Sequence, residues 1–254
     1  MSGPAPGPAT AAAPDPAVGA VVRASHLTKR YGDLVAVDDV SFSLEAGTVT
    51  GFLGPNGAGK TSTLRLLLGL AAPTSGEALV HGRPYAELDQ PAREVGAVLE
   101  SNDFHPGRSG RDHLRVLALA AGLSERRVDD VLELVALGTP AVRPVKSYSL
   151  GKRQRLGLAA ALLGEPRVLI LDEPTNGLDP VGVRWLRRLI RSFAEGGGTV
   201  LVSSHVLAEI SQSVDRVVII NGGRVVADAP VVALAGGGTS LEDAYVELTS
   251  GAIS

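Results

Sequence analysis

The sequence predicts an α/β fold with a mainly parallel central sheet, an antiparallel β subdomain and an inserted α-helical subdomain. Apolar strand segments alternate with helical segments over most of the 254 residues, which is typical of strands joined by crossover helices. Val168–Leu171 is fully apolar, as a strand buried on both faces should be. Between residues 109 and 137 the apolar positions adopt helical spacing, which predicts a helical lobe inserted into the fold.

The first hundred residues favour β structure after an irregular start. Residues 1–20 are mostly Pro, Ala and Gly, and we interpret them as a disordered tail. A turn is expected around Gly32, between two β-rich segments. The elements expected here are, in order, strands at residues 21–27, 40–44 and 47–53, a helix at 61–68, and strands at 77–81 and 95–100.

The rest of the chain continues the alternation. Expected helices lie at residues 111–121, 124–137, 149–163, 183–193 and 241–248, and expected strands at 168–171, 199–203 and 217–220. Gly222 and Gly223 fit a tight hairpin turn, because both central residues of such a turn need positive φ. We expect one domain at residues 21–233, with its helical lobe at about 101–163, and a C-terminal extension with a short helix at 234–254.

Composition excludes several classes of function. The net charge of −3 gives no overall basic field that would recruit nucleic acid. The absence of cysteine removes disulfides, thiolate metal sites and cysteine nucleophiles, and agrees with a reducing compartment. No apolar run approaches the roughly 18 residues of a membrane span.

Residues 54–61 match the pattern G-x-x-x-x-G-K-[ST] of a loop that wraps nucleotide phosphates. The glycines let backbone N–H groups turn inward and form an anion-binding nest. Lys60 is expected to reach the β- and γ-phosphates, and the Thr61 hydroxyl to bind Mg²⁺. A chance match in a glycine-rich turn is the alternative, but the strand before the loop and the helix after it favour the phosphate site. The nucleotide contacts expected here are Gly54, Pro55, Asn56, Gly57, Ala58, Gly59, Lys60, Thr61 and Ser62.

Two acids follow the apolar strand at residues 168–171. Asp172 is expected to hold Mg²⁺, and Glu173 to polarise a water for in-line attack on the γ-phosphate. The alternative is a strand that ends in a solvated acidic turn. The phosphate loop upstream favours the catalytic interpretation.

Ser149 and Gly151 mark a second expected anion site. Ser149 fits an N-cap, so its hydroxyl and the following helix N-terminus would face outward. This site has no phosphate partner inside its own domain. The economical interpretation is that it covers a nucleotide held by another copy.

At these residues the chain resembles the ATP-binding subunits of ABC transporters, over about residues 21–229. Residues 54–61 look like the Walker A loop, residues 168–172 like Walker B with Glu173 as base, and residues 149–152 like the family signature. The resemblance implies a P-loop NTPase (RecA-like) core that binds ATP and Mg²⁺. It also makes Asp179 the D-loop aspartate, His205 the switch histidine and Tyr31 the aromatic that stacks on adenine.

Some positions depart from the family pattern. The signature has Tyr148, Leu150 and Lys152 where the family has Leu, Gly and Gln. Glu100 stands where the family has its coupling glutamine, and a carboxylate there can still bind Mg²⁺ directly or through water.

Three residue groups have simpler alternative interpretations. His205 follows an expected strand whose end should line the ligand crevice, although it could only cap the next helix. Tyr31 could be an ordinary loop aromatic. Four arginines lie at helical spacing on one stripe, and a solvated face is expected for them, with nucleic-acid contact as the sharper alternative. They are Arg184, Arg187, Arg188 and Arg191.

The resemblance also implies partners. It predicts separate membrane permease subunits docked near residues 101–107, a head-to-tail second copy, and a cytoplasmic location on the inner face of the membrane. Residues 101–107 and 240–248 look like the drug, antibiotic or lipid export branch. A related ATPase acting on ribosomes or DNA is the alternative, but such relatives carry a second domain or a long coiled coil.

Overall fold

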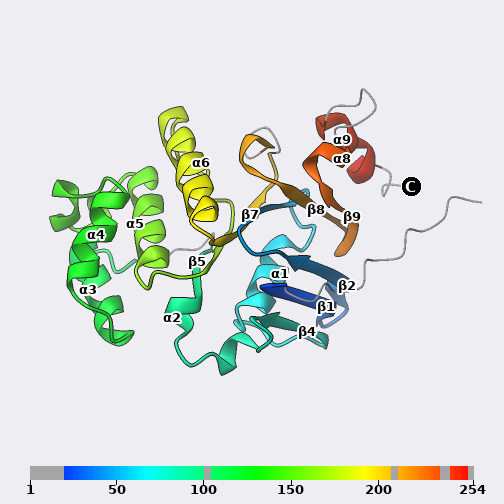
Figure 1. Cartoon of the computed structure of the whole chain (residues 1–254), viewed down its shortest axis with the longest axis horizontal. Helices are drawn as coiled ribbons and strands as arrows, with labels where there is room; N and C mark the ends of the chain where they lie inside the picture. Colours follow the sequence, from blue (N-terminus) through cyan, green and yellow to red (C-terminus); the bar gives the residue numbers. More distant parts are fainter. Residues whose placement is uncertain (1–19, 100–103, 207–210, 235–240, 251–254) are drawn as a thin grey trace, which may run out of the picture.

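A six-stranded sheet forms the centre of the computed structural model, which describes residues 20–99, 104–206, 211–234 and 241–250 (Figure 1). The strand order is β5-β6-β7-β3-β8-β9, and all neighbours are parallel except the β8–β9 hairpin. The strands are β3 (Val49–Leu53), β5 (Val95–Val98), β6 (Val168–Leu171), β7 (Thr199–Ser204), β8 (Arg216–Asn221) and β9 (Arg224–Pro230). The predicted α/β fold is confirmed.

A three-stranded antiparallel sheet and α1 (Lys60–Leu67) share an apolar core with one face of the large sheet. Its order is β2-β1-β4, with β1 (Val22–Tyr31), β2 (Leu34–Leu44) and β4 (Ser75–Val80). Phe42 of β2 meets Phe52 of β3 with ring centroids 5.3 Å apart, in the tilted geometry that aromatic pairs favour. This core holds α1, and therefore the loop before it, in place.

Helices cover the other face of the large sheet. The helical lobe consists of α3 (Gly110–Ala120), α4 (Arg126–Leu134) and α5 (Leu150–Leu162), while α6 (Pro180–Glu195) and α9 (Leu241–Ser250) pack nearer the middle and the far edge (Figure 1). The short helices are α2 (Pro91–Glu94), α8 (Val231–Leu234), η1 (Tyr85–Glu87), η2 (Thr139–Val142), η3 (Val145–Ser147) and η4 (Ser211–Ser213). None of the helices in the described ranges is long and apolar enough to cross a membrane.

Local chemistry explains where expected and observed elements agree and where they differ. The predicted hairpin turn is confirmed, because Asn221 pairs with Arg224 and the two glycines between them have φ of 54° and 81°. Helix α6 begins three residues earlier than expected, because Asp179 caps it and Pro180 occupies its first turn. The helix α4 also differs, since its N-cap is Glu125, although Ser124 Oγ still accepts from Arg126 N at 3.3 Å.

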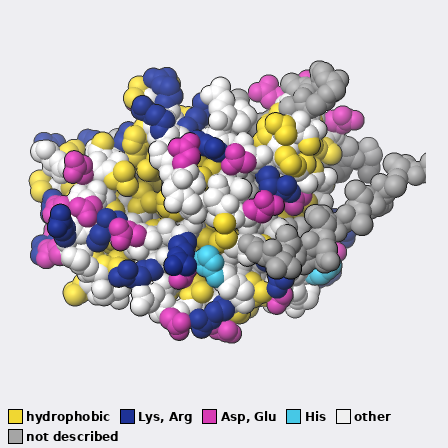
Figure 2. Space-filling view, in the orientation of Figure 1, with side chains coloured by type: hydrophobic (Ala, Val, Ile, Leu, Met, Phe, Trp, Pro, Cys, Tyr) yellow, Lys and Arg dark blue, Asp and Glu magenta, His cyan; other side chains and the backbone are white. Residues whose placement is uncertain are grey.

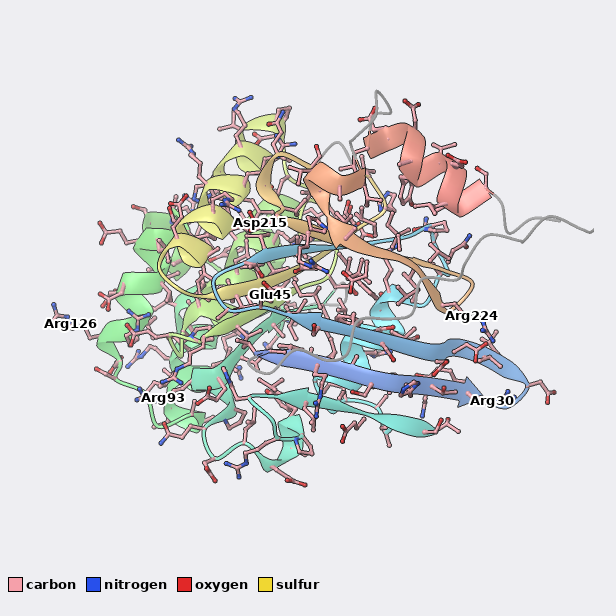
Figure 3. All side chains as sticks on the ribbon, turned by 45° about the vertical axis from the view of Figure 1, so that its right-hand side comes forward. Arg30, Glu45, Arg93, Arg126, Asp215 and Arg224 are labelled. Carbon is pink, nitrogen blue, oxygen red and sulfur yellow. The ribbon has the colours of Figure 1, made fainter. Side chains whose placement is uncertain are left out.

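Charged side chains of both signs are interspersed over the face shown in Figure 2. In the arginine stripe of α6, Arg191 is not simply solvated: it pairs with Asp215 at 2.9 Å. Asp215, labelled in Figure 3, also accepts from the Val49 backbone N–H at 2.8 Å. At the tip of the β8–β9 hairpin, Arg224 pairs with Asp38 of β2 at 2.6 Å. These pairs connect α6 and both sheets around β3.

Candidate active site

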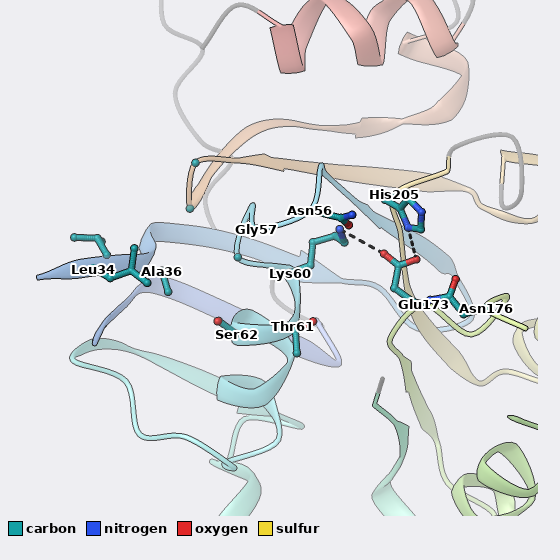
Figure 4. Close-up of a pocket in the computed structure, with 14 residues that line it drawn as sticks. Leu34, Ala36, Asn56, Gly57, Lys60, Thr61, Ser62, Glu173, Asn176 and His205 are labelled. Carbon is teal, nitrogen blue, oxygen red and sulfur yellow. Dashed lines mark hydrogen bonds and ion pairs between the residues drawn. The ribbon is translucent and has the colours of Figure 1, made fainter. Parts of the chain in front are cut away.

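A cleft of about 750 Å³ opens where the carboxyl ends of β3, β6 and β7 meet (Figure 4). Ligand residues gather at such strand ends in open α/β sheets. Three segments line it: the phosphate loop and α1, the loops after β6 and β7, and β2 with the β8–β9 turn. The lining residues are Asn56, Gly57, Gly59, Lys60, Thr61, Ser62, Glu173, Asn176, His205, Leu34, Val35, Ala36, Gly222 and Gly223.

The phosphate loop needs its glycines for close backbone approach. Gly57 and Gly59 have φ of 80° and 103°, values that residues with a side chain rarely adopt. A Cβ on Gly59 would lie 2.4 Å from the Ala36 carbonyl oxygen, and one on Gly54 would lie 2.3 Å from the Ile220 carbonyl oxygen. The loop is therefore held between β2 and β8, with its amide groups next to the start of α1.

Lys60 reaches across the loop to the acid on the opposite wall. Its Nζ donates to the carbonyls of Gly54 at 2.7 Å and Pro55 at 3.3 Å. It also lies 3.4 Å from Glu173 Oε1, and both side chains are less than a tenth exposed (Figure 4). A buried cation aimed along the loop is suited to phosphate oxygens.

Asp172 meets the hydroxyl of the phosphate loop. Thr61 Oγ1 donates to Asp172 Oδ2 at 2.8 Å, and Asp172 is only 1% exposed. The Asp172 backbone N–H donates to Val98 O at 2.7 Å, which continues the pairing of β6 with β5. A hydroxyl and a carboxylate are oxygen ligands of the kind that Mg²⁺ prefers, so this pair could hold the ion together with nucleotide phosphates.

Glu173 is held between Lys60 and His205. His205 Nδ1 lies 2.8 Å from Glu173 Oε2, on the side away from the lysine (Figure 4). The backbone of Glu173 has φ of 48°, a conformation that costs a non-glycine residue on the order of 1–3 kcal/mol. This backbone turns the carboxylate into the cleft. The contact of His205 with Glu173 places its ring at the cleft, as expected for a residue at the end of β7.

Ser203 is a site residue that the sequence analysis did not identify. Its side chain is fully buried, and its Oγ donates to Asp172 Oδ1 at 2.6 Å. The same oxygen accepts from the Glu173 backbone N–H at 2.9 Å, so one hydroxyl fixes both acids. A polar residue directly after the apolar run Val200–Val202, in the strand next to the one that carries the acids, is the signal that could have revealed it.

Ser203→Ala is expected to lower ATP turnover about tenfold, which corresponds to roughly 1.4 kcal/mol of barrier. The alanine removes the bond that holds the Glu173 backbone in its positive-φ conformation, while the phosphate loop keeps its contacts. Steady-state kinetics and calorimetry should show lower kcat with ATP affinity within a few-fold. Thr50→Val is the matched control, because the Thr50 hydroxyl is buried in β3 without a hydrogen-bond partner among the described residues. Equal losses in both variants would contradict a specific role for Ser203.

Several sequence-predicted residues lie outside the cleft. Asp179 Oδ1 accepts from Gly182 N at 2.7 Å and caps α6. Ser149 caps α5, accepting from Lys152 N at 3.4 Å, and Gly151 follows it in the first turn. Tyr31 is 47% exposed at the end of β1, with the Lys29 ammonium 5.0 Å from its ring centroid.

Glu100 lies outside the described residues, and some residues that line the cleft were not predicted from the sequence. Asn176, Ala36 and the Gly222–Gly223 turn line the cleft, although the sequence analysis gave them no role there. Ala36 and the two glycines line the cleft because β2 and the β8–β9 turn pack against the phosphate loop, which no local motif predicts. Asn176 lies in the loop after β6, where its backbone N–H donates to the Glu173 carbonyl at 3.1 Å.

Comparison with known proteins supports the interpretation of residues 54–61 as a nucleotide-binding loop. The family model described as ABC transporter matches residues 37–176. The bacitracin transport ATP-binding protein BcrA of Bacillus licheniformis is 43% identical over 83% of this chain and 70% of that protein. The lantibiotic transport ATP-binding protein SrtF of Streptococcus pyogenes is 38% identical over 81% of this chain and 89% of that protein.

Solved structures agree with these matches. An ATP-binding subunit of an ABC transporter superimposes with a TM-score of 0.82 and 29% identity, over 90% of this chain and 99% of that one. A dimeric ATP-binding cassette, MJ0796, bound to ADP and Pi, has a TM-score of 0.74 over 82% of this chain and 98% of that one; its 22% identity shows the fold alone. The chain with this phosphate loop and acid pair belongs to the ABC transporter family, as one of its ATP-binding, ATP-hydrolysing subunits.

Proposed function

We propose that this subunit hydrolyses ATP to power export of a drug, antibiotic or lipid-like substrate through a separate permease, on the cytoplasmic face of the membrane. The observation that carries the ATPase chemistry is the cleft in which Lys60, Glu173 and His205 meet, with Asp172 bonded to Thr61 of its wall. The similarity to ATP-binding proteins for bacitracin and lantibiotic transport supports an antibiotic-type substrate.

The residues of the cleft divide the chemistry among them. Backbone amides of the loop and Lys60 bind the phosphates, and Thr61 with Asp172 would hold Mg²⁺. When bound, the metal neutralises negative charge that develops on the phosphate oxygens. Glu173 accepts the proton of the attacking water, and His205 orients the Glu173 carboxylate through its 2.8 Å contact. Glu100 as a further Mg²⁺ neighbour stays a prediction.

The adenine would lie at the other end of the cleft, against β2. Leu34, Val35 and Ala36 line that end, and Tyr31 pairs with Leu34 across the β1–β2 turn. An exposed tyrosine ring that already holds a cation on one face can still offer a stacking platform. We therefore propose that the adenine stacks on Tyr31 at the rim of the cleft.

A second copy would complete the site. Ser149 is exposed, and neither it nor Gly151 lines the cleft of its own chain. A Cβ on Gly151 would lie 3.1 Å from the Gly177 carbonyl oxygen, so the signature segment packs on the D-loop that contains Asp179. We propose a head-to-tail pair, with each ATP between the phosphate loop of one copy and Ser149, Gly151 and Asp179 of the other.

ATP is expected to join the pair when hydrolysis is blocked. The Glu173→Gln variant should be monomeric without nucleotide and dimeric with ATP, as measured by light scattering. Adding Ser149→Arg should prevent this dimer, because bulk and positive charge would occupy the shared surface. The matched control is Ser109→Arg, the same change at the N-cap of α3, which should leave the dimer intact. If Ser149→Arg and Ser109→Arg dimerise equally well, Ser149 is not at the interface.

The permease would dock beside the helical lobe. An apolar groove of about 620 Å³ runs between the lobe and the short helices before β5, with Leu117, Leu123 and Tyr85 among its lining residues. None of the described residues in the segment at 101–107, the docking region expected from the sequence, lines this groove. The first part of that segment lies outside the described residues.

The function is tested by capture and by growth. A tagged Glu173→Gln variant isolated from detergent-treated membranes with ATP should bring down a multi-span membrane protein. Recovery of ribosomes or DNA instead would support the alternative class of soluble ATPase.

Cells that lack the gene should become more sensitive to a peptide antibiotic of the bacitracin or lantibiotic class, with rescue by wild type and no rescue by Glu173→Gln. Unchanged sensitivity would argue against that substrate class.

A further inference from the structure

The turn of the β8–β9 hairpin is bonded to the phosphate loop by its backbone. The Gly223 N–H donates to the Ala58 carbonyl at 3.0 Å, and the Gly223 carbonyl accepts from the Asp38 N–H of β2 at 2.8 Å. The contact is close, since a Cβ on Gly59 would lie 3.6 Å from the Gly223 Cα. Because Ala58 and Gly59 form the middle of the phosphate loop, the turn helps to set where their amides point.

Asn221 connects this turn to the C-terminal helix. It is the last residue of β8, and its Nδ2 donates to the Thr249 carbonyl at 2.9 Å. Thr249 lies in the last turn of α9, where backbone carbonyls have no intrahelical partner, so the asparagine acts as a cap from another element. The Thr249 hydroxyl in turn donates to the Tyr245 carbonyl at 2.7 Å, which reinforces the same helical turn.

The helix α9 is fixed against the core as well as against Asn221. Leu241 is 8% exposed, and Tyr245 and Leu248 pack on the apolar core that contains residues of β3 and β8. Burial raises the pKa of the Tyr245 phenol, and the negative charge of Glu173 raises it further, so the phenol stays neutral near the cleft. Figure 1 shows α9 beside the β8–β9 hairpin, and Figure 4 shows the hairpin between this helix and the cleft.

We propose that α9 positions the phosphate loop for nucleotide through the Asn221 side chain and the Gly222–Gly223 turn. Asn221 is a positioning residue, since it touches neither the cleft nor any catalytic group. Without its bond to Thr249 the turn gains freedom, and the loop amides must be ordered when phosphates bind. That ordering lowers affinity. The inference goes beyond the transport activity and rests on the assignment of residues 54–61 as the phosphate loop.

The test compares Asn221→Ala and Asn221→Asp with the control Glu247→Ala. Asp keeps the size of Asn but places a carboxylate against the Thr249 carbonyl, so it reports on the bond even if Ala disturbs packing. Glu247 is exposed on the same helix. Calorimetry with ATP should give a Kd raised about three- to tenfold in both Asn221 variants, the effect of one part-buried hydrogen bond, and unchanged in Glu247→Ala.

Hydrogen exchange provides the readout that a purely structural role would not change. In nucleotide-free protein, peptides covering residues 54–61 and 222–224 should exchange faster in the Asn221 variants, while a peptide covering β6 exchanges as in wild type. Unchanged Kd with unchanged exchange in the loop overturns the proposal, and so does a uniform increase that includes β6. If wild-type protein binds no ATP, the phosphate-loop assignment fails instead, which separates the two claims.

Discussion

Glu173→Gln is expected to keep ATP binding and to lose turnover by about 100-fold or more, which is the effect of removing a general base. The glutamine has the same shape, so the contacts around it can persist. An amide cannot accept a proton from water near neutral pH. In the structure the two carboxylate oxygens of Glu173 face Lys60 at 3.4 Å and His205 at 2.8 Å, which aims the group into the cleft.

A glutamate with similar backbone strain but no place in the cleft provides the matched control. Glu165 has φ of 54°, against 48° for Glu173, and its side chain pairs with Arg127 at the surface. Glu165→Gln should therefore turn over ATP like wild type. Single-turnover measurements with saturating MgATP separate binding from chemistry. Wild-type turnover in Glu173→Gln would mean that the base is another group, and Glu100 would be tested next.

The parts of this site that local chemistry dictates could be predicted from the sequence. The phosphate loop needs glycine at positions where φ is positive or a carbonyl lies against the missing Cβ, and Gly57 and Gly59 are such positions. The apolar strand Val168–Leu171 places Asp172 and Glu173 at the edge of the sheet where its parallel strands end and where ligand residues gather. The hairpin turn at Gly222 followed from two adjacent glycines alone.

The parts of the site that depend on contacts between distant segments could not be predicted from the sequence. Ser203 lies 31 residues from Asp172 along the chain, and only the pairing of β6 with β7 brings its hydroxyl within 2.6 Å of the carboxylate. Asn221 meets Thr249 through the packing of α9, which no motif encodes. The role expected for Ser149 needs a second chain, so a single copy shows only its capping bond.

Lys60→Ala is expected to reduce ATP affinity by about 100-fold or more, the combined loss of charge-assisted bonds worth roughly 1.5–3 kcal/mol each. The Lys60 ammonium is the buried cation of the cleft that faces the loop, where nucleotide phosphates would sit. Its loss removes the main side-chain countercharge to the triphosphate. It also removes the cation that faces Glu173, a side chain that is 7% exposed, so the Glu173 carboxylate would repel the incoming phosphates more strongly.

Calorimetry with ATP decides this prediction, with two further variants to interpret it. Lys152→Ala removes an exposed lysine of the signature segment and should bind ATP to the single chain like wild type. Lys60→Ala combined with Glu173→Gln separates the two causes, because removing the carboxylate should recover part of the affinity if repulsion contributes. No recovery would assign the whole loss to the missing ammonium. Micromolar binding retained by Lys60→Ala would show that the loop amides alone hold the phosphates and that the lysine contact is dispensable.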